Sequence, residues 1–130
     1  MIVVVAAVIE QENAFLVTQR PAGTHLAGLW EFPGGKLEPS ETHTEGLQRE
    51  LREELGVDVE VGELAFYTAH DYSDRAVALY FYRCAIAGTP RPQLGQPLRW
   101  VSREELATLP FPPADEELIR RLLSAGTAAP

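Results

Sequence analysis

The chain has 130 residues, 45% hydrophobic and 23% charged, and this size and composition predict one globular domain over residues 1–130. A formal net charge of −8 argues against a protein that binds nucleic-acid polymers, yet permits a small nucleotide ligand, because a bound metal can supply positive charge locally. The sequence has one cysteine, so no disulfide within the chain is expected. It has no convincing signal peptide and no apolar run long enough to span a membrane, so we expect a cytoplasmic protein without membrane contact.

Apolar runs predict strands both before and after one central helix. The expected strands cover residues 2–10, 14–19, 29–32, 57–72, 76–87 and 98–101. Residues 2–10 are almost continuously apolar, which is typical of a strand buried on both faces, and residues 11–13 form the turn of a hairpin to the second strand. Residues 33–35, Pro-Gly-Gly, are expected to end the third strand sharply.

Capping residues predict where the helices begin and end. Thr42 and Glu45 have the spacing of a capping box and Gly56 suits a left-handed stop, so the central helix is expected over residues 42–55. Ser102 is expected to cap a short helix, and a last amphipathic helix is expected from Asp115 or a neighbour to residue 123. This order of elements predicts an α/β fold with a mixed sheet between helices.

The central helix carries a cluster of carboxylates. Glu50, Glu53 and Glu54 stand at i, i+3 and i+4, which places them within one sector of the helix surface. The adjoining sector is an apolar stripe of Leu47, Leu51 and Leu55. Neighbouring like charges on a helix repel one another, and a hard cation such as Mg²⁺, which takes oxygen ligands, would offset that repulsion.

The carboxylate spacing alone also allows a solvated, charged helix face with no ligand. Gly46 stands on the carboxylate side of the helix, where we expect its missing side chain to leave room for a ligand. The choice between the two interpretations depends on the residues around the helix.

Those residues extend the pattern to 23 positions. From Gly35 the chain runs Gly, five residues, Glu41, seven residues, Arg49-Glu50-Leu51, one residue, Glu53-Glu54, one residue, Gly56-Val57. This resembles the signature of the Nudix hydrolases at every fixed position. The resemblance implies an α/β/α sandwich with a mixed sheet, and an enzyme that cleaves a nucleoside diphosphate linked to another group with the aid of Mg²⁺ or Mn²⁺.

The resemblance also implies roles for the residues of the signature. Glu50, Glu53 and Glu54 would hold the metal together with the backbone carbonyl of Gly34. Arg49 would pair with Glu41 and orient the helix carboxylates. The expected catalytic residues are Glu50, Glu53 and Arg49, with Glu50 as the acceptor of a proton from the attacking water.

Residues outside the signature resemble the MutT-type nucleotide-pool enzymes of this family. They are Arg20 with His25, the run from Glu31 to Lys36, the pair Asp74-Arg75, and the run from Phe111 to Asp115. The resemblance implies that substrate contacts come from Arg20, His25, Asp74, Arg75 and Asp115. For Arg20 and Arg75 the alternative is an ordinary surface arginine, and Trp30 and Phe32 are expected in the core.

The chain departs from the MutT pattern at two positions. Leu94 stands where MutT has a late metal-binding glutamate, so either the loop register is shifted or the helix carboxylates act alone. In the second case, alanine at Leu94 is expected to change stability more than metal affinity. Asp115 stands where MutT reads the base with an asparagine.

The resemblance implies a nucleoside triphosphate pyrophosphohydrolase that releases a nucleoside monophosphate and pyrophosphate. An ionised Asp115 only accepts hydrogen bonds and would select a base edge with N–H donors, which both oxidised guanine and cytosine have. We expect 8-oxo-dGTP as first substrate, because Arg20, Asp74-Arg75 and the run from Phe111 resemble MutT, and CTP or a modified dCTP as second. A protonated Asp115 could also donate, but only if burial raised its pKa. The alternative is a nucleotide-binding sensor without turnover. In either case we expect a monomer or homodimer.

Overall fold

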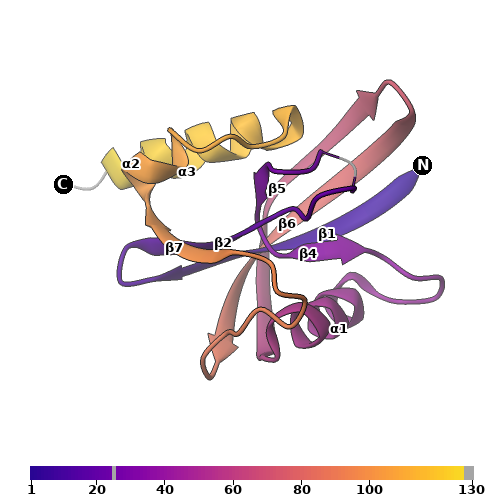
Figure 1. The fold of residues 1–130 in the computed structure, drawn as a ribbon, viewed down its shortest axis with the longest axis horizontal. Helices are drawn as coiled ribbons and strands as arrows, with labels where there is room; N and C mark the ends of the chain where they lie inside the picture. The colour runs from indigo at the N-terminus through magenta and orange to yellow at the C-terminus, as the bar shows by residue number, and fades with distance from the viewer. Residues whose placement is uncertain (25, 128–130) are drawn as a thin grey trace.

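The computed structural model describes residues 1–24 and 26–127 and has three layers. A mixed sheet lies between α1 (His43–Leu55) on one face and α2 (Arg103–Leu106) with α3 (Glu116–Thr127) on the other, as Figure 1 shows. A single 3₁₀ turn, η1 (Pro113–Asp115), leads into α3. The predicted α/β/α sandwich is therefore confirmed. No helix within the described ranges is long and apolar enough to cross a membrane.

The sheet is built around β1, the most continuously apolar segment of the chain. Its strands are β1 (Ile2–Gln11), β2 (Ala14–Gln19), β3 (Trp30–Glu31), β4 (Gly34–Lys36), β5 (Asp58–Tyr72), β6 (Arg75–Ala87) and β7 (Leu98–Ser102). The main order is β3-β2-β1-β6-β5, with β4 also paired to β1 and β7 to β2. The β1–β6 pair is parallel and all other pairs are antiparallel, so the sheet is mixed as predicted.

The third strand ends at Glu31, just before Pro33, as expected, but residues 34–36 then form a separate strand, β4, that the sequence did not predict. Gly34 and Gly35 pair with Ala6 and Val5 in an antiparallel register. A Cβ at Gly34 would meet the carbonyl oxygen of Val5 at 2.0 Å, so only glycine permits this approach. The pairing fixes the backbone of Gly34 beside the central strand.

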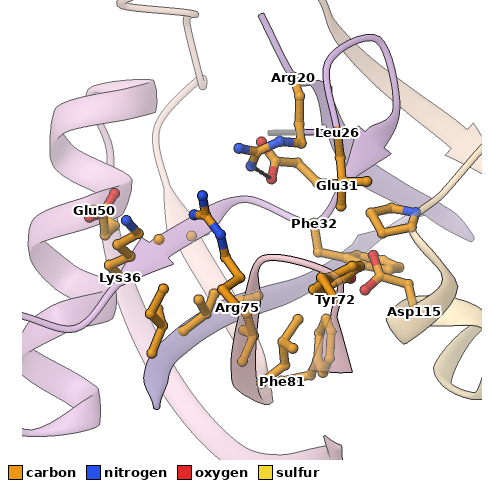
Figure 2. A pocket seen from close by; sticks show the side chains of 18 residues that line it. Arg20, Leu26, Glu31, Phe32, Lys36, Glu50, Tyr72, Arg75, Phe81 and Asp115 are labelled. Carbon is orange, nitrogen blue, oxygen red and sulfur yellow. Dashed lines mark hydrogen bonds and ion pairs between the residues drawn. The ribbon is translucent and has the colours of Figure 1, made fainter. Parts of the chain in front are cut away.

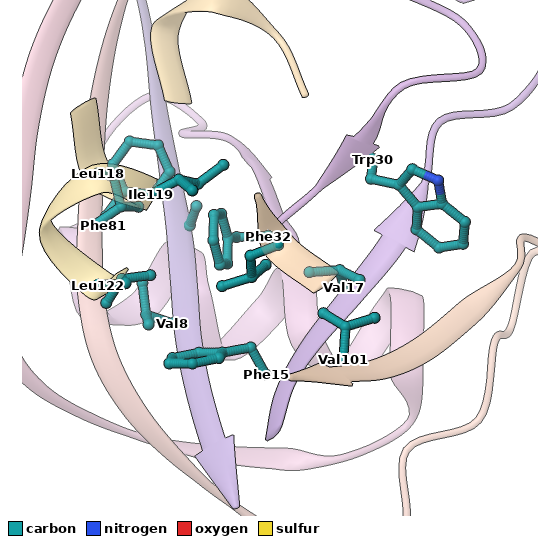
Figure 3. Packing of buried hydrophobic residues seen from close by; sticks show 12 residues of the cluster. Val8, Phe15, Val17, Trp30, Phe32, Phe81, Val101, Leu118, Ile119 and Leu122 are labelled. Atoms are coloured by element: carbon teal, nitrogen blue, oxygen red, sulfur yellow. The ribbon is translucent and has the colours of Figure 1, made fainter. Parts of the chain in front are cut away.

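Alternate side chains of β1 serve two separate cores, which confirms that this strand is buried on both faces. Val5, Ala7 and Ile9 pack with the leucine stripe of α1. Ala6 and Val8 pack on the other face, against residues of β2, β6 and α3, and Figure 3 shows this second core. Trp30 and Phe32 belong to it, as predicted.

The ends of α1 are the predicted ones. Thr42 Oγ1 accepts a hydrogen bond from the backbone N–H of Glu45, the backbone N–H of Thr42 donates one to the Glu45 carboxylate, and Gly56 ends the helix at φ 65°. The prediction for Gly46 was wrong. A Cβ at Gly46 would meet Leu37 Cδ1 at 2.5 Å, so its missing side chain makes room for core packing and not for a ligand.

Candidate active site

The carboxylates of α1 line an open cavity. Glu50, Glu53 and Glu54 border a volume of about 480 Å³ together with Gly34 and the loop residues Leu94 and Gln96. The side chain of Glu50 is only 15% exposed, whereas that of Glu53 is 58% exposed. The helix spacing and the pairing of Gly34 with β1 thus bring together the residues expected to hold a metal.

The electrostatics of this carboxylate cavity show an excess of negative charge. Burial raises the pKa of Glu54 well above its usual value, and a hydrogen bond and charge repulsion from Glu50 raise it further. Glu31 adds to this rise, while Arg20 opposes it. A divalent cation would compensate the same charges, and the ligands offered are all oxygens, as Mg²⁺ prefers.

The absence of a side chain at Gly35 leaves room for the carboxylate of Glu50. A Cβ at Gly35 would lie 2.5–2.6 Å from the carboxyl atoms of Glu50, so a side chain there would displace this carboxylate. Within the described ranges, no three acidic, histidine or cysteine side chains lie close enough together to hold a metal ion in their present orientations. The donors and the space fit a metal, but Glu50 and Glu53 are turned toward an arginine.

That arginine is Arg49, which connects the carboxylates of α1 to the preceding loop. Its Nε and Nη2 donate to the two oxygens of Glu41 at 2.6 and 2.9 Å, so the predicted pair is present. Its Nη1 donates to Glu50 at 2.8 Å and to Glu53 at 3.0 Å. The hydrogen bonds from Arg49 and, second, from the backbone N–H of Glu38 lower the pKa of Glu41 to about 2. Arg49 therefore limits the orientations of the carboxylates on both sides of it.

A second cavity of about 410 Å³ adjoins the first, and Arg20, Glu31, Gly34 and Glu50 line both. Figure 2 shows its course, with Glu50 and Lys36 at one end and Asp115 with Tyr72 at the other. Phe32 and Phe81 give the second end apolar walls. The two cavities could therefore hold a polyanionic group and an attached ring system in one molecule.

Asp115 is the buried polar group at the ring end of this cavity. Its residue is 3% exposed, and within the described ranges no hydrogen bond to its carboxyl group is found. Burial raises the pKa of Asp115 to about 8, with a contribution from the negative charge of Glu31. A raised pKa favours the protonated form of Asp115, and in that form its carboxyl group can both donate and accept.

This shift makes the stability of the protein depend on pH. Between the ordinary aspartate pKa of 3.8 and about 8, the folded state keeps a proton that the unfolded state loses. The free energy of unfolding therefore falls as pH rises through this window, by up to ~1.4 kcal/mol per pH unit. Replacement of Asp115 by asparagine removes this dependence, so the variant should gain stability over wild type between about pH 5 and pH 8.

Urea unfolding of both proteins across that window measures the effect. Asp71→Asn is the matched control, because Asp71 is exposed and its substitution should leave the pH dependence unchanged. If the free energy of unfolding of wild type and of Asp115→Asn changed with pH in the same way, Asp115 would be ionised in the folded protein.

The structure assigns different positions to the other predicted substrate residues. Arg20 lines both cavities and Arg75 lines the second, so both arginines face a possible ligand. Asp74 lines neither, and it accepts a hydrogen bond from Arg75 Nη2 at 3.2 Å, which connects it to an arginine of the second cavity. His25, also predicted to contact substrate, lies outside the described residues.

Glu31 is a site residue that the sequence analysis missed. It lines both cavities and accepts a hydrogen bond from Arg20 Nη1 at 2.9 Å, drawn as a dashed line in Figure 2. Trp30 and Phe32 on either side of it are buried in the core. An acidic residue between two core aromatics of a strand must point away from that core, and this alternation was the available signal.

Leu94 lines the rim of the carboxylate cavity, and its residue is 71% exposed. Residues 88–97 contain no aspartate or glutamate, so no shift of register supplies a carboxylate from this loop. Of the two alternatives for this loop, only the one in which the helix carboxylates act alone remains. Leu94→Ala is no longer expected to change stability much, because an exposed side chain contributes little to the core.

Comparisons with known proteins agree with this geometry. A family model described as NUDIX domain matches residues 4–121. The CTP pyrophosphohydrolase of Escherichia coli is 42% identical over 100% of this chain and 97% of its own length. The 8-oxo-dGTP diphosphatase of Escherichia coli is 35% identical over 92% and 94% of the two chains. The solution structure of the E. coli ORF135 protein aligns with a TM-score of 0.86, at 42% identity, over 100% of this chain and 94% of that chain. These similarities extend over both cavities.

Proposed function

Because this chain belongs to the NUDIX domain family and is a pyrophosphohydrolase of the MutT type, we propose that it hydrolyses nucleoside triphosphates with a divalent metal. The products would be a nucleoside monophosphate and pyrophosphate. One observation carries this proposal: a cavity lined by the α1 carboxylates shares lining residues with a second cavity that ends at the buried carboxyl group of Asp115.

The metal would be held by Glu50, Glu53, Glu54 and the carbonyl of Gly34. When bound, Mg²⁺ or Mn²⁺ neutralises phosphate charge and makes hydroxide accessible near neutral pH. Glu50 accepts the proton of the attacking water, because it is the most enclosed carboxylate shared by both cavities and the 88–97 loop has none.

The cations of the second cavity suit the phosphate chain of the substrate. Arg20, Lys36 and Arg75 line this cavity, and an arginine can bind two phosphate oxygens at once. Arg20 is already oriented by its ion pair with Glu31. We therefore assign Arg20 and Arg75 a role in binding the nucleotide. Their position on the cavity wall favours this role over that of ordinary surface arginines.

The base would be read by Asp115. A protonated carboxyl group matches a base edge with one donor beside one acceptor, such as N4–H and N3 of cytosine or N7–H and O6 of oxidised guanine. The major-groove edge of undamaged guanine has acceptors only and is a poor match. We rank cytosine nucleotides first, since the CTP pyrophosphohydrolase is 42% identical over the whole chain, and 8-oxo-dGTP second. This reverses the order expected from the sequence.

Initial rates with Mg²⁺ for CTP, dCTP, 8-oxo-dGTP and dGTP test the proposal. We expect turnover of at least one of the first three and a lower kcat/KM for dGTP. Tight nucleotide binding without any turnover would instead favour the sensor, and equal rates for all four would contradict base reading by Asp115.

A further inference from the structure

The C-terminal end of α1 is held from outside the helix. The last carbonyl groups of any helix have no partner within it. Here the loop between β6 and β7 supplies the donors: the backbone N–H of Arg91 binds Leu55 O at 2.9 Å, and that of Gln93 binds Glu54 O at 2.8 Å. The turn that carries Glu54 is therefore fixed by this loop.

The side chain of Gln96 joins the same network at two points. Its Nε2 donates to Glu54 O at 3.3 Å, and its Oε1 accepts from the backbone N–H of Leu94 at 3.0 Å. Gln96 is 7% exposed, although the other residues from 91 to 97 are exposed. A buried amide in an exposed loop, bonded through both of its ends, indicates a specific structural task.

That task concerns the carboxylate cavity, because Gln96 lines it together with both of its bonded neighbours, Glu54 and Leu94. We propose that Gln96 is a positioning residue, whose carboxamide fixes the last turn of α1 and thereby the Glu54 carboxylate in the metal site. The inference rests on the proposed use of Glu54 as a metal ligand.

Only a side chain with a donor and an acceptor can make this bridge. Methionine has a similar length and no N–H donor, so Gln96→Met removes the bond to Glu54 O. Residues that orient metal ligands usually change metal affinity or activity by about 10- to 100-fold when replaced. We expect Gln96→Met to weaken Mn²⁺ binding by about tenfold. This is the lower end of that range, because the two backbone N–H donors of the loop still hold the end of α1.

Gln93→Met is the matched control in the same loop. The Gln93 side chain is exposed and donates to Arg91 O, whereas its bond to Glu54 comes from the backbone and survives the substitution. Its Mn²⁺ affinity should stay close to that of wild type. Gln96→Asn is the second variant: it keeps the polar group but is too short to reach Glu54 O, so it should also weaken Mn²⁺ binding.

The measurement is titration of each protein with Mn²⁺, with free Mn²⁺ followed by electron paramagnetic resonance well below the melting temperature. Weaker binding by the Gln96 variants and not by Gln93→Met supports the inference. Unchanged Mn²⁺ affinity with a lower melting temperature would overturn it, as would a wild type that binds no Mn²⁺. Nucleotide hydrolysis by wild type, measured separately, decides the proposed function on its own.

Discussion

Glutamine in place of Glu54 is expected to lower kcat/KM by about a thousandfold, equivalent to ~4 kcal/mol of transition-state stabilisation. Glutamine has almost the shape of glutamate but no negative charge, so the variant loses a metal ligand and little packing. Glu53→Gln should have an effect of the same order. Glu53 is more exposed and is bonded to Arg49, but it lines the same cavity as Glu54.

Stability separates this loss from a folding defect. Burial and the neighbouring Glu50 raise the pKa of Glu54, so its negative charge costs stability in the metal-free protein as pH rises. Glu54→Gln should therefore unfold at the same urea concentration as wild type or a higher one. Glu60→Gln, an exposed carboxylate on β5, is the control and should keep full activity. Near-normal turnover in both Glu53→Gln and Glu54→Gln would refute the assignment of the metal site.

Removal of the Asp115 side chain is expected to abolish selection among bases. A good two-bond contact contributes about 1–3 kcal/mol of discrimination, or roughly 5- to 150-fold in a ratio of rate constants. Asp115→Ala should lower the ratio of kcat/KM for the preferred nucleotide over dGTP by this factor and leave metal dependence unchanged. An unchanged ratio would mean that Asp115 only leads into α3 and reads no base.

Asp115→Asn should behave differently from Asp115→Ala, because an amide resembles the protonated form of Asp115 that the sequence analysis left open. With its pKa raised to about 8, the wild-type carboxyl group is neutral at pH 7 and offers one donor and one acceptor, as an amide does. The asparagine variant should keep the wild-type ratio near neutral pH. Above about pH 8 wild type loses its donor and its ratio should fall, whereas the variant should hold its ratio.

The sequence predicted those parts of the fold that local patterns determine. The apolar run of β1 and the residues Thr42 and Gly56 placed the central strand and helix correctly, because burial and capping depend on neighbours in the chain. The pairing of Gly34 with Ala6 and the parallel β1–β6 contact depend on residues far apart in sequence. No local pattern specifies such pairs.

The site was predictable to a similar extent. The helix carboxylates and Arg49 with Glu41 follow from a fixed spacing, and the structure places them together. Glu31 was missed and the charge state of Asp115 was left open, because both depend on the cavity that encloses them. The contact of Gly46 with Leu37 was misjudged for the same reason, since a missing side chain does not reveal what fills its place.

The products formed from dCTP test the central claim most directly. Phosphorus-31 NMR of the reaction follows every phosphate at once, with Mg²⁺ and then with excess EDTA. We predict deoxycytidine monophosphate and pyrophosphate in equal amounts with Mg²⁺, and no reaction in EDTA; 8-oxo-dGTP, if it is the substrate, must give the corresponding pair. Release of orthophosphate with a nucleoside diphosphate, or hydrolysis that continues in EDTA, would contradict a metal-dependent pyrophosphohydrolase.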